Sequence, residues 1–424
     1  MVTVRALAVA VLAAAAGIAC RGTPPGSQSA AGLVDSLVPA VERAAGMRFR
    51  TPPRVAMRSR AQVRAYLSAK LDDELPAARA AGMETAYQLF GLLPDSVHLR
   101  PLLLDLLSEQ VIGYYDADSA MLFGVAGSPR DQLRLVMAHE MVHALQGQYL
   151  PLDSIFHDLR SNDRLTAAQA VLEGQATVAS IGIYSPDTGR TAGDDFWSLY
   201  GDQVREQQAA MPVFSRAPLV VREGLIFPYV AGAEFMHWWA TASGHADTLP
   251  YGPRMPASTE QVLHPDRYAR GDAPLDVVID TGGIVLHEDV LGEMETRVLL
   301  AVSRGSNRPD ELPAVGWGGD RYRVITTPEG PALVWYIVFD DEASADRFVR
   351  LAAGGLGRAS RPGYRASLDR VTVGGKPAVR HVVAPASWTG WSRVPAASLR
   401  EPGPYSPTSF PSQNAPNPKT PPST

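Results

Sequence analysis

The chain of 424 residues is 46% apolar and 20% charged, which favours a folded protein with a substantial core and about two or three domains. Its formal net charge is −5 and it has no basic run interleaved with aromatic residues, which argues against a nucleic-acid partner. Cys20 is the single cysteine, so the chain can form no internal disulfide.

The N-terminal stretch MVTVRALAVAVLAAAAGIAC joins an arginine to a short run of Ala, Val and Leu. The run is shorter than the roughly 20 residues that span a bilayer, and it predicts a signal peptide over residues 1–20. Its end, AGIAC, resembles the lipobox of bacterial lipoproteins, although Gly17 stands where a leucine is more usual. The resemblance implies that Cys20 carries a lipid that anchors an extracytoplasmic protein to a bacterial membrane. A secreted protein is the alternative.

Residues 21–33, rich in Gly, Pro, Ser and Ala, predict a flexible linker. Beyond the linker, apolar spacing predicts mainly helices over residues 34–280. The predicted elements are a helix at 34–46, a strand at 52–59, helices at 60–82 and 99–110, a hairpin at 111–125, and helices at 131–146, 165–183 and 229–243.

The helix at 131–146 lies in LRLVMAHEMVHALQGQ, which has the spacing H-E-x-x-H. Residues four apart on a helix lie one turn along the same face, so His139 and His143 can bind one metal ion. Catalytic zinc sites combine such imidazole ligands with an open position for water. Glu140 adjoins His139 and can take a proton from that water and pass it to a leaving amine. The pattern predicts a zinc hydrolase.

A helix with two histidines and a glutamate can also arise by chance and bind no metal. Here, apolar residues at 135, 136, 142 and 145 surround the motif and predict that it packs into a core. Burying Glu140 there without a partner would cost free energy, and a metal or substrate site would account for it. The context therefore favours a metal site.

A zinc site of this kind needs a third protein ligand. Tyr149 stands where the metzincin pattern has its third histidine, which excludes that class. Glu173, in AVLEGQATV, lies on the next long predicted helix, and a helix hairpin would return it to the two histidines. Small residues at 170, 174, 176 and 179 would let this helix approach the motif helix closely. The alternatives to Glu173 are four loop side chains, Asp153, His157, Asp158 and Asp163, or a site without a third protein ligand.

Further side chains are candidates to stabilise a transition-state oxyanion: Tyr229 in IFPYVAG, and His264 and Tyr268 in STEQVLHPDRY. A capping box of Ser258 and Gln261, followed by a proline that stops the helix, explains the second stretch on structural grounds alone. The predicted hairpin at 111–125 could offer an edge strand to an extended peptide, or it could simply cover the core.

The pattern changes near residue 280. A helix near 289–303 is followed by strands at 321–327 and 332–339, a helix near 342–353, and strands at 369–373 and 377–384. This order predicts one antiparallel sheet in a small α+β domain over residues 285–390. The glycines of GWGGDRY predict a tight turn that buries Trp317. Residues 398–424, dense in Pro, Ser and Thr, predict a disordered tail.

Two segments, VMAHEMVHALQGQ and AVLEGQATV, together resemble the gluzincin zinc metallopeptidases, in which a glutamate on a later helix completes the metal site. A longer series of segments spans residues 35–345 and resembles a family of uncharacterised bacterial metallopeptidases, often lipoproteins. The series is GYYDADSAMLFG, AHEMVHALQGQ, AVLEGQAT, FPYVAGAEF, STEQVLHPDRY and GWGGDRY.

The resemblance implies one Zn²⁺ per chain, held by His139, His143 and Glu173, with Glu140 as the catalytic base. Gln175 departs from the family, which favours Asp after the Glu-Gly pair, and this bears on a hydrogen bond to a ligand rather than on a ligand itself.

The sequence as a whole predicts an α+β protein: a mainly helical, zincin-like catalytic domain with a small β-hairpin, followed by a smaller antiparallel-sheet domain. The predicted function is that of a membrane-anchored, extracytoplasmic zinc metallopeptidase acting on a peptide or protein. Two other functions fit the same residues. One is a non-catalytic envelope lipoprotein that uses the motif helix as a scaffold, and the other is a zinc hydrolase of a non-peptide amide or ester.

Overall fold

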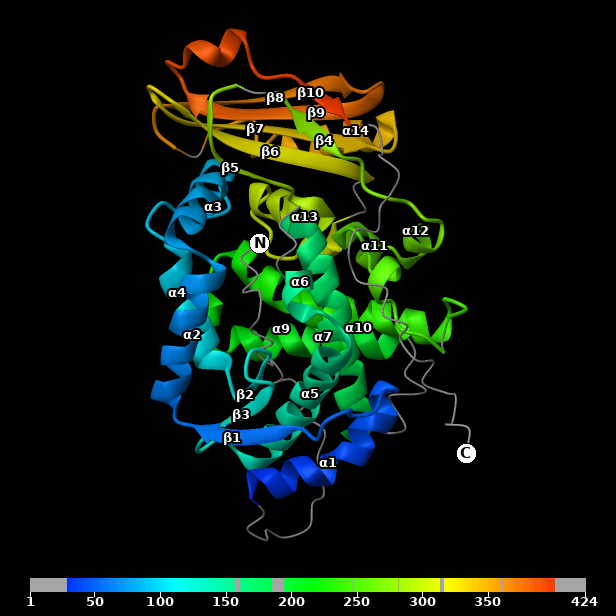
Figure 1. The fold of residues 1–424 in the computed structure, drawn as a ribbon. Coiled ribbons are helices and arrows are strands. Elements are labelled where there is room, and N and C mark those ends of the chain that lie inside the picture. The colour runs from blue at the N-terminus through cyan, green and yellow to red at the C-terminus, as the bar shows by residue number, and fades with distance from the viewer. Residues whose placement is uncertain are drawn as a thin grey trace.

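The computed structural model describes residues 29–156, 161–184, 194–245, 247–280, 282–312, 316–359 and 361–400. A helical part lies beneath a layer of antiparallel strands (Figure 1), so the architecture is mixed α+β with an antiparallel sheet toward the C-terminus. The predicted signal peptide, Cys20, most of the predicted linker and residues 401–424 lie outside the described ranges. Within those ranges, no helix is long and apolar enough to cross a membrane.

Helices dominate the chain up to residue 269. Their bounds are α1 (Ala30–Ala45), α2 (Arg60–Glu74), α3 (Ala77–Phe90), α4 (Leu99–Gln110), α5 (Arg130–Tyr149), α6 (Leu152–Phe156), α7 (Asn162–Tyr184), α9 (Asp194–Ala209), α10 (Leu219–Thr241), α11 (Thr259–Leu263) and α12 (Pro265–Ala269). Capping residues explain why several of these helices begin and end where they do. Ser29 caps α1 by accepting a hydrogen bond from Gly32 N, and Gly46, at φ 68°, ends it. The helices α5, α7 and α10 pack together at the centre of the helical part (Figure 1).

A small sheet packs against α5. It consists of β1 (Arg54–Arg58), β2 (Gly113–Asp116) and β3 (Met121–Val125), in the order β1-β3-β2. β1 runs parallel to β3, and β2 runs antiparallel to it, so the predicted hairpin is confirmed. β2 is an edge strand, but all four of its residues are buried.

The larger sheet has five antiparallel strands in the order β5-β6-β7-β9-β8. Their bounds are β5 (Ile284–Asp289), β6 (Trp317–Thr327), β7 (Gly330–Phe339), β8 (Tyr364–Val373) and β9 (Lys376–Pro385). β4 (Val277–Ile279) and β10 (Ala397–Leu399) form a separate antiparallel pair. α14 (Glu342–Ala352) packs on the sheet, whereas α13 (Gly292–Ser303) lies between the sheet and the helical part (Figure 1).

One hydrophobic core extends from α1 to β9 and joins the two parts. At the junction, the ring of Phe90 in α3 meets the rings of Tyr322 and Trp335 edge-on, with centroids 5.3 and 5.4 Å apart. The buried Asp320 carboxylate accepts hydrogen bonds from the indoles of Trp317 and Trp335 and from two backbone amides at the start of α13. The helical part and the sheet are therefore packed as one body around a shared core.

Most predicted elements are confirmed with shifted ends. The helix predicted at 60–82 is broken at Pro76 into α2 and α3. The helix predicted at 229–243 begins at Leu219 and contains Pro228. The tight turn predicted around Trp317 is wrong, because the tryptophan begins β6 at a bulge, although its indole is buried as expected. Residues 398 and 399, which were predicted to belong to a disordered tail, lie in β10 instead, and the predicted tail from residue 401 lies outside the described residues.

Candidate metal centre

α5 presents two imidazoles on one face. The helix is buried from Leu135 to Gln146 because it lies between the small sheet and α7. His139 and His143, one turn apart, have ring centroids 4.8 Å apart, and their Nε2 atoms are separated by 3.1 Å. Both nitrogens thus approach the same point.

Glu173 of α7 completes a group of three. Its Oε2 lies 3.0 Å from His139 Nε2 and 3.2 Å from His143 Nε2, and all three side chains are buried. Among the described residues, this group is the one whose ligand atoms are arranged so that they could hold a metal ion. Tetrahedral zinc ligands about 2.0–2.1 Å from the ion lie about 3.3 Å from one another, and two imidazoles with one carboxylate are a known catalytic set. The residues therefore fit a zinc-type ion.

The charges in this group favour a cation. Burial lowers the pKa of His139 to about 4. Burial also opposes a charge on His143, but the adjacent Glu173 carboxylate raises the pKa of His143 to about 9. Burial likewise opposes a charge on Glu173, yet His143 holds the pKa of this carboxyl down at about 2. At neutral pH, one proton compensates the buried carboxylate, and a divalent ion would displace that proton.

Glu140, the residue between the two histidines in the motif, lies beside the group. Its carboxylate contributes, less than Glu173 does, to the raised pKa of His143. Glu140 Oε2 accepts a hydrogen bond of 2.8 Å from Tyr115 N in the edge strand β2. The sequence suggested β2 as an edge strand that could bind an extended peptide. One backbone amide of this strand is instead hydrogen-bonded to Glu140.

Tyr229 of α10 stacks on His139, with ring centroids 5.9 Å apart and 28° between the planes. This placement follows a close crossing of α7 and α10, since a Cβ on Gly174 would lie 2.2 Å from Gly232 O. A Cβ on Gly232 would in turn lie 2.1 Å from Ala170 O. The small residues at 170 and 174 therefore allow α10 to approach α7 closely, whereas the sequence predicted that they allow α5 to do so.

The other predicted oxyanion donors have contacts elsewhere. His264 Nε2 lies 3.0 Å from Glu293 Oε1 and 3.4 Å from Arg297 Nη2, both on α13. The Tyr268 hydroxyl donates to Arg254 O at 2.7 Å. A role for His264 or Tyr268 in the reaction stays a prediction that these contacts do not support.

Asp163, one of the alternatives to Glu173, is engaged at the N-terminal end of α7. Its Oδ1 accepts hydrogen bonds from the Thr259 amide and hydroxyl. At 1.5 Å of helix rise per residue, it lies about 15 Å along α7 from Glu173. The alternatives His157 and Asp158, and the side chain of Asp153, lie outside the described residues.

Three residues that the sequence did not single out lie near the group. Gln146 Oε1 is 2.8 Å from His143 Nδ1, and the Tyr251 hydroxyl donates to Gln175 Oε1. Tyr200 of α9 is the third: burial, with a smaller contribution from the Glu173 carboxylate, raises its pKa above the usual value for tyrosine. The spacing of Gln146 from His143, three positions along one helix, was a signal that could have identified it.

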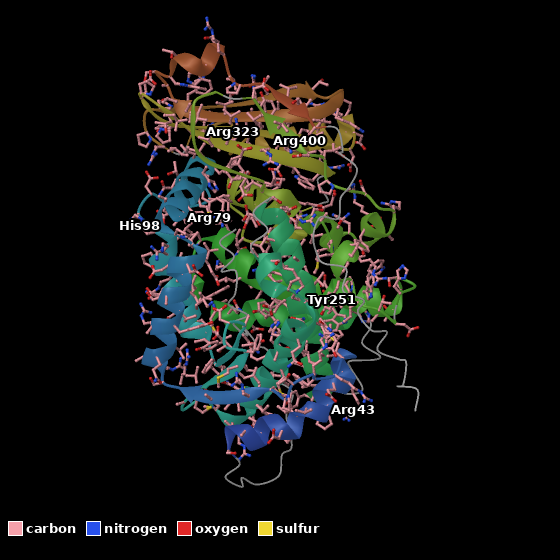
Figure 2. The ribbon with its side chains drawn as sticks, viewed as in Figure 1. Arg43, Arg79, His98, Tyr251, Arg323 and Arg400 are labelled. Carbon is pink, nitrogen blue, oxygen red and sulfur yellow. The ribbon has the colours of Figure 1, made fainter. Side chains whose placement is uncertain are left out.

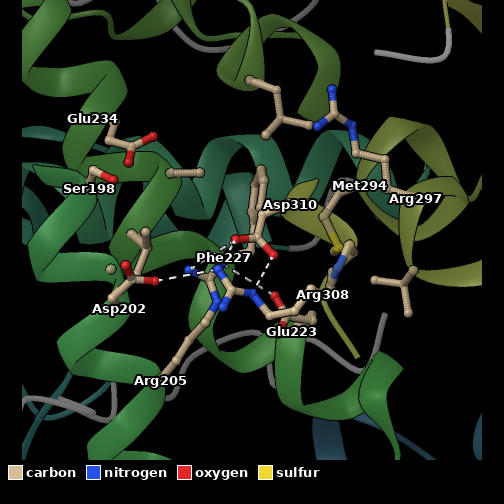
Figure 3. A pocket seen from close by; sticks show the side chains of 16 residues that line it. Ser198, Asp202, Arg205, Glu223, Phe227, Glu234, Met294, Arg297, Arg308 and Asp310 are labelled. Atoms are coloured by element: carbon tan, nitrogen blue, oxygen red, sulfur yellow. Dashed lines mark hydrogen bonds and ion pairs between the residues drawn. The ribbon is translucent and has the colours of Figure 1, made fainter. Parts of the chain in front are cut away.

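A pocket of about 330 Å³ lies on the opposite face of α10 (Figure 3). Phe227, Val230 and Glu234 line it, whereas on the other face of the same helix Gly232 meets α7 and Tyr229 stacks on His139 of α5. The pocket is thus separated from the group of His139, His143 and Glu173 by the helix.

Most charged groups of this pocket take part in ion pairs. Arg205 lies 3.6 Å from Glu223, and Arg308 lies 3.1 Å from Asp310 (Figure 3). Because the pairs compensate their own charges, the pocket does not indicate a charged ligand.

Comparison with known families gives a match to a domain of unknown function (DUF8575) over residues 283–376. The matched segment includes α13, α14 and most of the five-stranded sheet, and it does not include α5 or α7. No curated protein and no solved structure matches the chain significantly. A functional argument therefore depends on the residues of the site.

Proposed function

We propose that the protein is a zinc-dependent metallopeptidase in which His139, His143 and Glu173 hold the ion. The proposal depends most on one observation: two imidazole nitrogens and a carboxylate oxygen from two helices lie within 3.2 Å of one another in the core. Packing alone gives no reason to bring three such atoms together in a buried place. Metal coordination does, because each of them is a zinc ligand.

When bound, a zinc ion would polarise a water molecule and the scissile carbonyl. Glu140 is the residue placed to accept the proton of the attacking water and to deliver it to the leaving amine. The hydrogen bond from Tyr115 N orients the Glu140 carboxylate. Of the three predicted donors to a transition-state oxyanion, Tyr229 is the one that contacts a residue of the group, since it stacks on His139.

The helical part would then be a zincin-like catalytic domain of the gluzincin kind, with a glutamate as third ligand. The AGIAC segment supports an extracytoplasmic protein that is attached to the membrane through Cys20. A peptide or protein is the substrate class that we propose. A general base beside a metal ion suits hydrolysis of an amide bond, and the same site would also fit a non-peptide amide or ester.

Glu140→Gln tests the proposed role of the base. We expect wild type and variant to retain about one zinc per chain, and only the wild type to cleave an unstructured protein such as casein. Glu109→Gln is a matched control, since Glu109 also accepts backbone amide hydrogen bonds but lies on α4, outside the group. It should cleave like the wild type.

Two results would contradict the proposal, the first for the role of Glu140 and the second for the enzyme class. Full activity of Glu140→Gln would remove Glu140 as the base. A zinc-loaded wild type that cleaves no peptide bond would exclude a peptidase, and activity on small amides or esters would then indicate the non-peptide hydrolase.

A further inference from the structure

A chain of two glutamines supports the imidazole of His143 on the side away from Glu173. His143 Nδ1 lies 2.8 Å from Gln146 Oε1. Gln146 Nε2 donates to Leu172 O at 3.0 Å and to Gln175 Oε1 at 2.8 Å. Gln146 is fully buried and Gln175 is 4% exposed, so water does not replace these bonds.

Two backbone carbonyls determine which way each amide faces. A carbonyl oxygen only accepts hydrogen bonds, so Gln146 must direct its NH₂ group to Leu172 O and its Oε1 to His143. In the same way, Gln175 Nε2 donates to Ala45 O at 3.3 Å. Its Oε1 is therefore left to accept from Gln146 and from the Tyr251 hydroxyl. His143 Nδ1 must then be the donor to Gln146.

We propose that Gln146, Gln175 and Tyr251 form a relay that keeps a hydrogen on His143 Nδ1 and thereby keeps the Nε2 lone pair directed at the metal. The three are positioning residues, and the inference rests on the proposed metal site. The relay runs from α5 through α7 to Tyr251, which Figure 2 labels in the helical part above Arg43 of α1.

The relay serves one of the two imidazoles. Among the described residues, His139 Nδ1 has no hydrogen-bond partner, and the ring is placed instead by stacking on Tyr229. The orientation of His143 thus depends on an amide acceptor, whereas metal-ligating histidines often use a carboxylate or backbone carbonyl for this purpose.

The zinc affinity of the purified full-length protein tests the relay, measured with zinc chloride in competition with a chromophoric chelator. Gln146→Leu removes the acceptor, and we expect zinc binding to weaken by about 10- to 100-fold. Gln146→Glu keeps an acceptor for His143 Nδ1 and should bind zinc more tightly than Gln146→Leu. Gln110→Leu, which replaces another buried glutamine, on α4, should bind like the wild type.

If Gln146 only supported the fold, Gln146→Leu would bind zinc more tightly than Gln146→Glu. Leucine packs well in a core, whereas a buried glutamate at this position would have no N–H to donate to Leu172 O. Weaker binding by Gln146→Glu than by Gln146→Leu, or unchanged binding by Gln146→Leu, would overturn the relay and leave the metal site standing. A wild type that binds zinc but hydrolyses nothing would overturn the proposed function and leave the relay standing. A wild type that binds no zinc would overturn both.

Discussion

Gly174 of α7 and Gly232 of α10 meet backbone to backbone, so closely that a Cβ on Gly174 would lie 2.2 Å from Gly232 O. Glu173 immediately precedes the first glycine, and Tyr229 lies nearly one turn before the second. The same helix crossing therefore places Glu173, the proposed third ligand, on one helix and the ring that stacks on His139 on the other.

Gly232→Ala tests this crossing. The added methyl group would meet the backbone of α7, which cannot move as a side chain can, so we expect a loss of about 1–3 kcal/mol in the free energy of unfolding. Urea denaturation measures this free energy of unfolding. We also expect the zinc affinity to fall, because a displacement of α7 moves Glu173. Gly354→Ala is the control, since nothing lies within 4 Å of its Cβ position. Equal stability of both variants would contradict the close crossing.

Tyr229→Phe separates the ring from the hydroxyl. The phenylalanine ring can keep the stacking on His139, so zinc content should be unchanged. If the hydroxyl stabilises the transition-state oxyanion, kcat should fall by about 10²-fold with little change in KM. Steady-state kinetics on a defined peptide measures both constants. A variant as active as the wild type would exclude this hydroxyl and direct attention to Tyr200, the buried tyrosine near Glu173.

Asp163 makes the stability of the protein depend on pH. Burial, opposed by hydrogen bonds from Thr259 and reinforced by Asp320 and Glu295, raises its pKa to about 8 from the ordinary value of 3.8. Between these values the native state keeps a proton that the unfolded chain releases. The stabilisation is complete below about pH 4 and is lost as the pH rises toward 8.

Asp163→Asn removes this titration and keeps an oxygen to accept from Thr259. We therefore expect the free energy of unfolding of the wild type to decline more steeply from pH 4 to pH 8 than that of the variant. Urea titrations at several pH values provide the comparison. Parallel pH dependence of the two proteins would show that Asp163 is not the group responsible.

The sequence was most informative where the chemistry is local. His139 and His143 share a helix face at a spacing that one helical turn imposes, and Glu173 lies on the next long helix, so a hairpin brings it back. The structure places the three side chains together. Their role in metal binding stays a prediction.

What the sequence did not predict depends on contacts between distant segments. Tyr251 lies 76 residues from Gln175, and no local pattern connects them. The partner of Gly174 also required the structure, since a small residue shows that something approaches but not which helix. α9 is a different case: its buried Trp197, Tyr200 and Val204 recur at helical spacing, so that signal was present and was overlooked.

The zinc content of the purified protein, measured by elemental analysis after dialysis against buffer with trace zinc, decides whether His139, His143 and Glu173 bind a metal ion. Glu173→Gln replaces the carboxylate with a neutral amide of the same shape, and Glu109→Gln makes the same change outside the group. We predict about one zinc per chain in the wild type and in Glu109→Gln, and much less in Glu173→Gln. A wild type without zinc, or a Glu173→Gln variant that retains as much zinc as the wild type, would contradict the proposed metal centre.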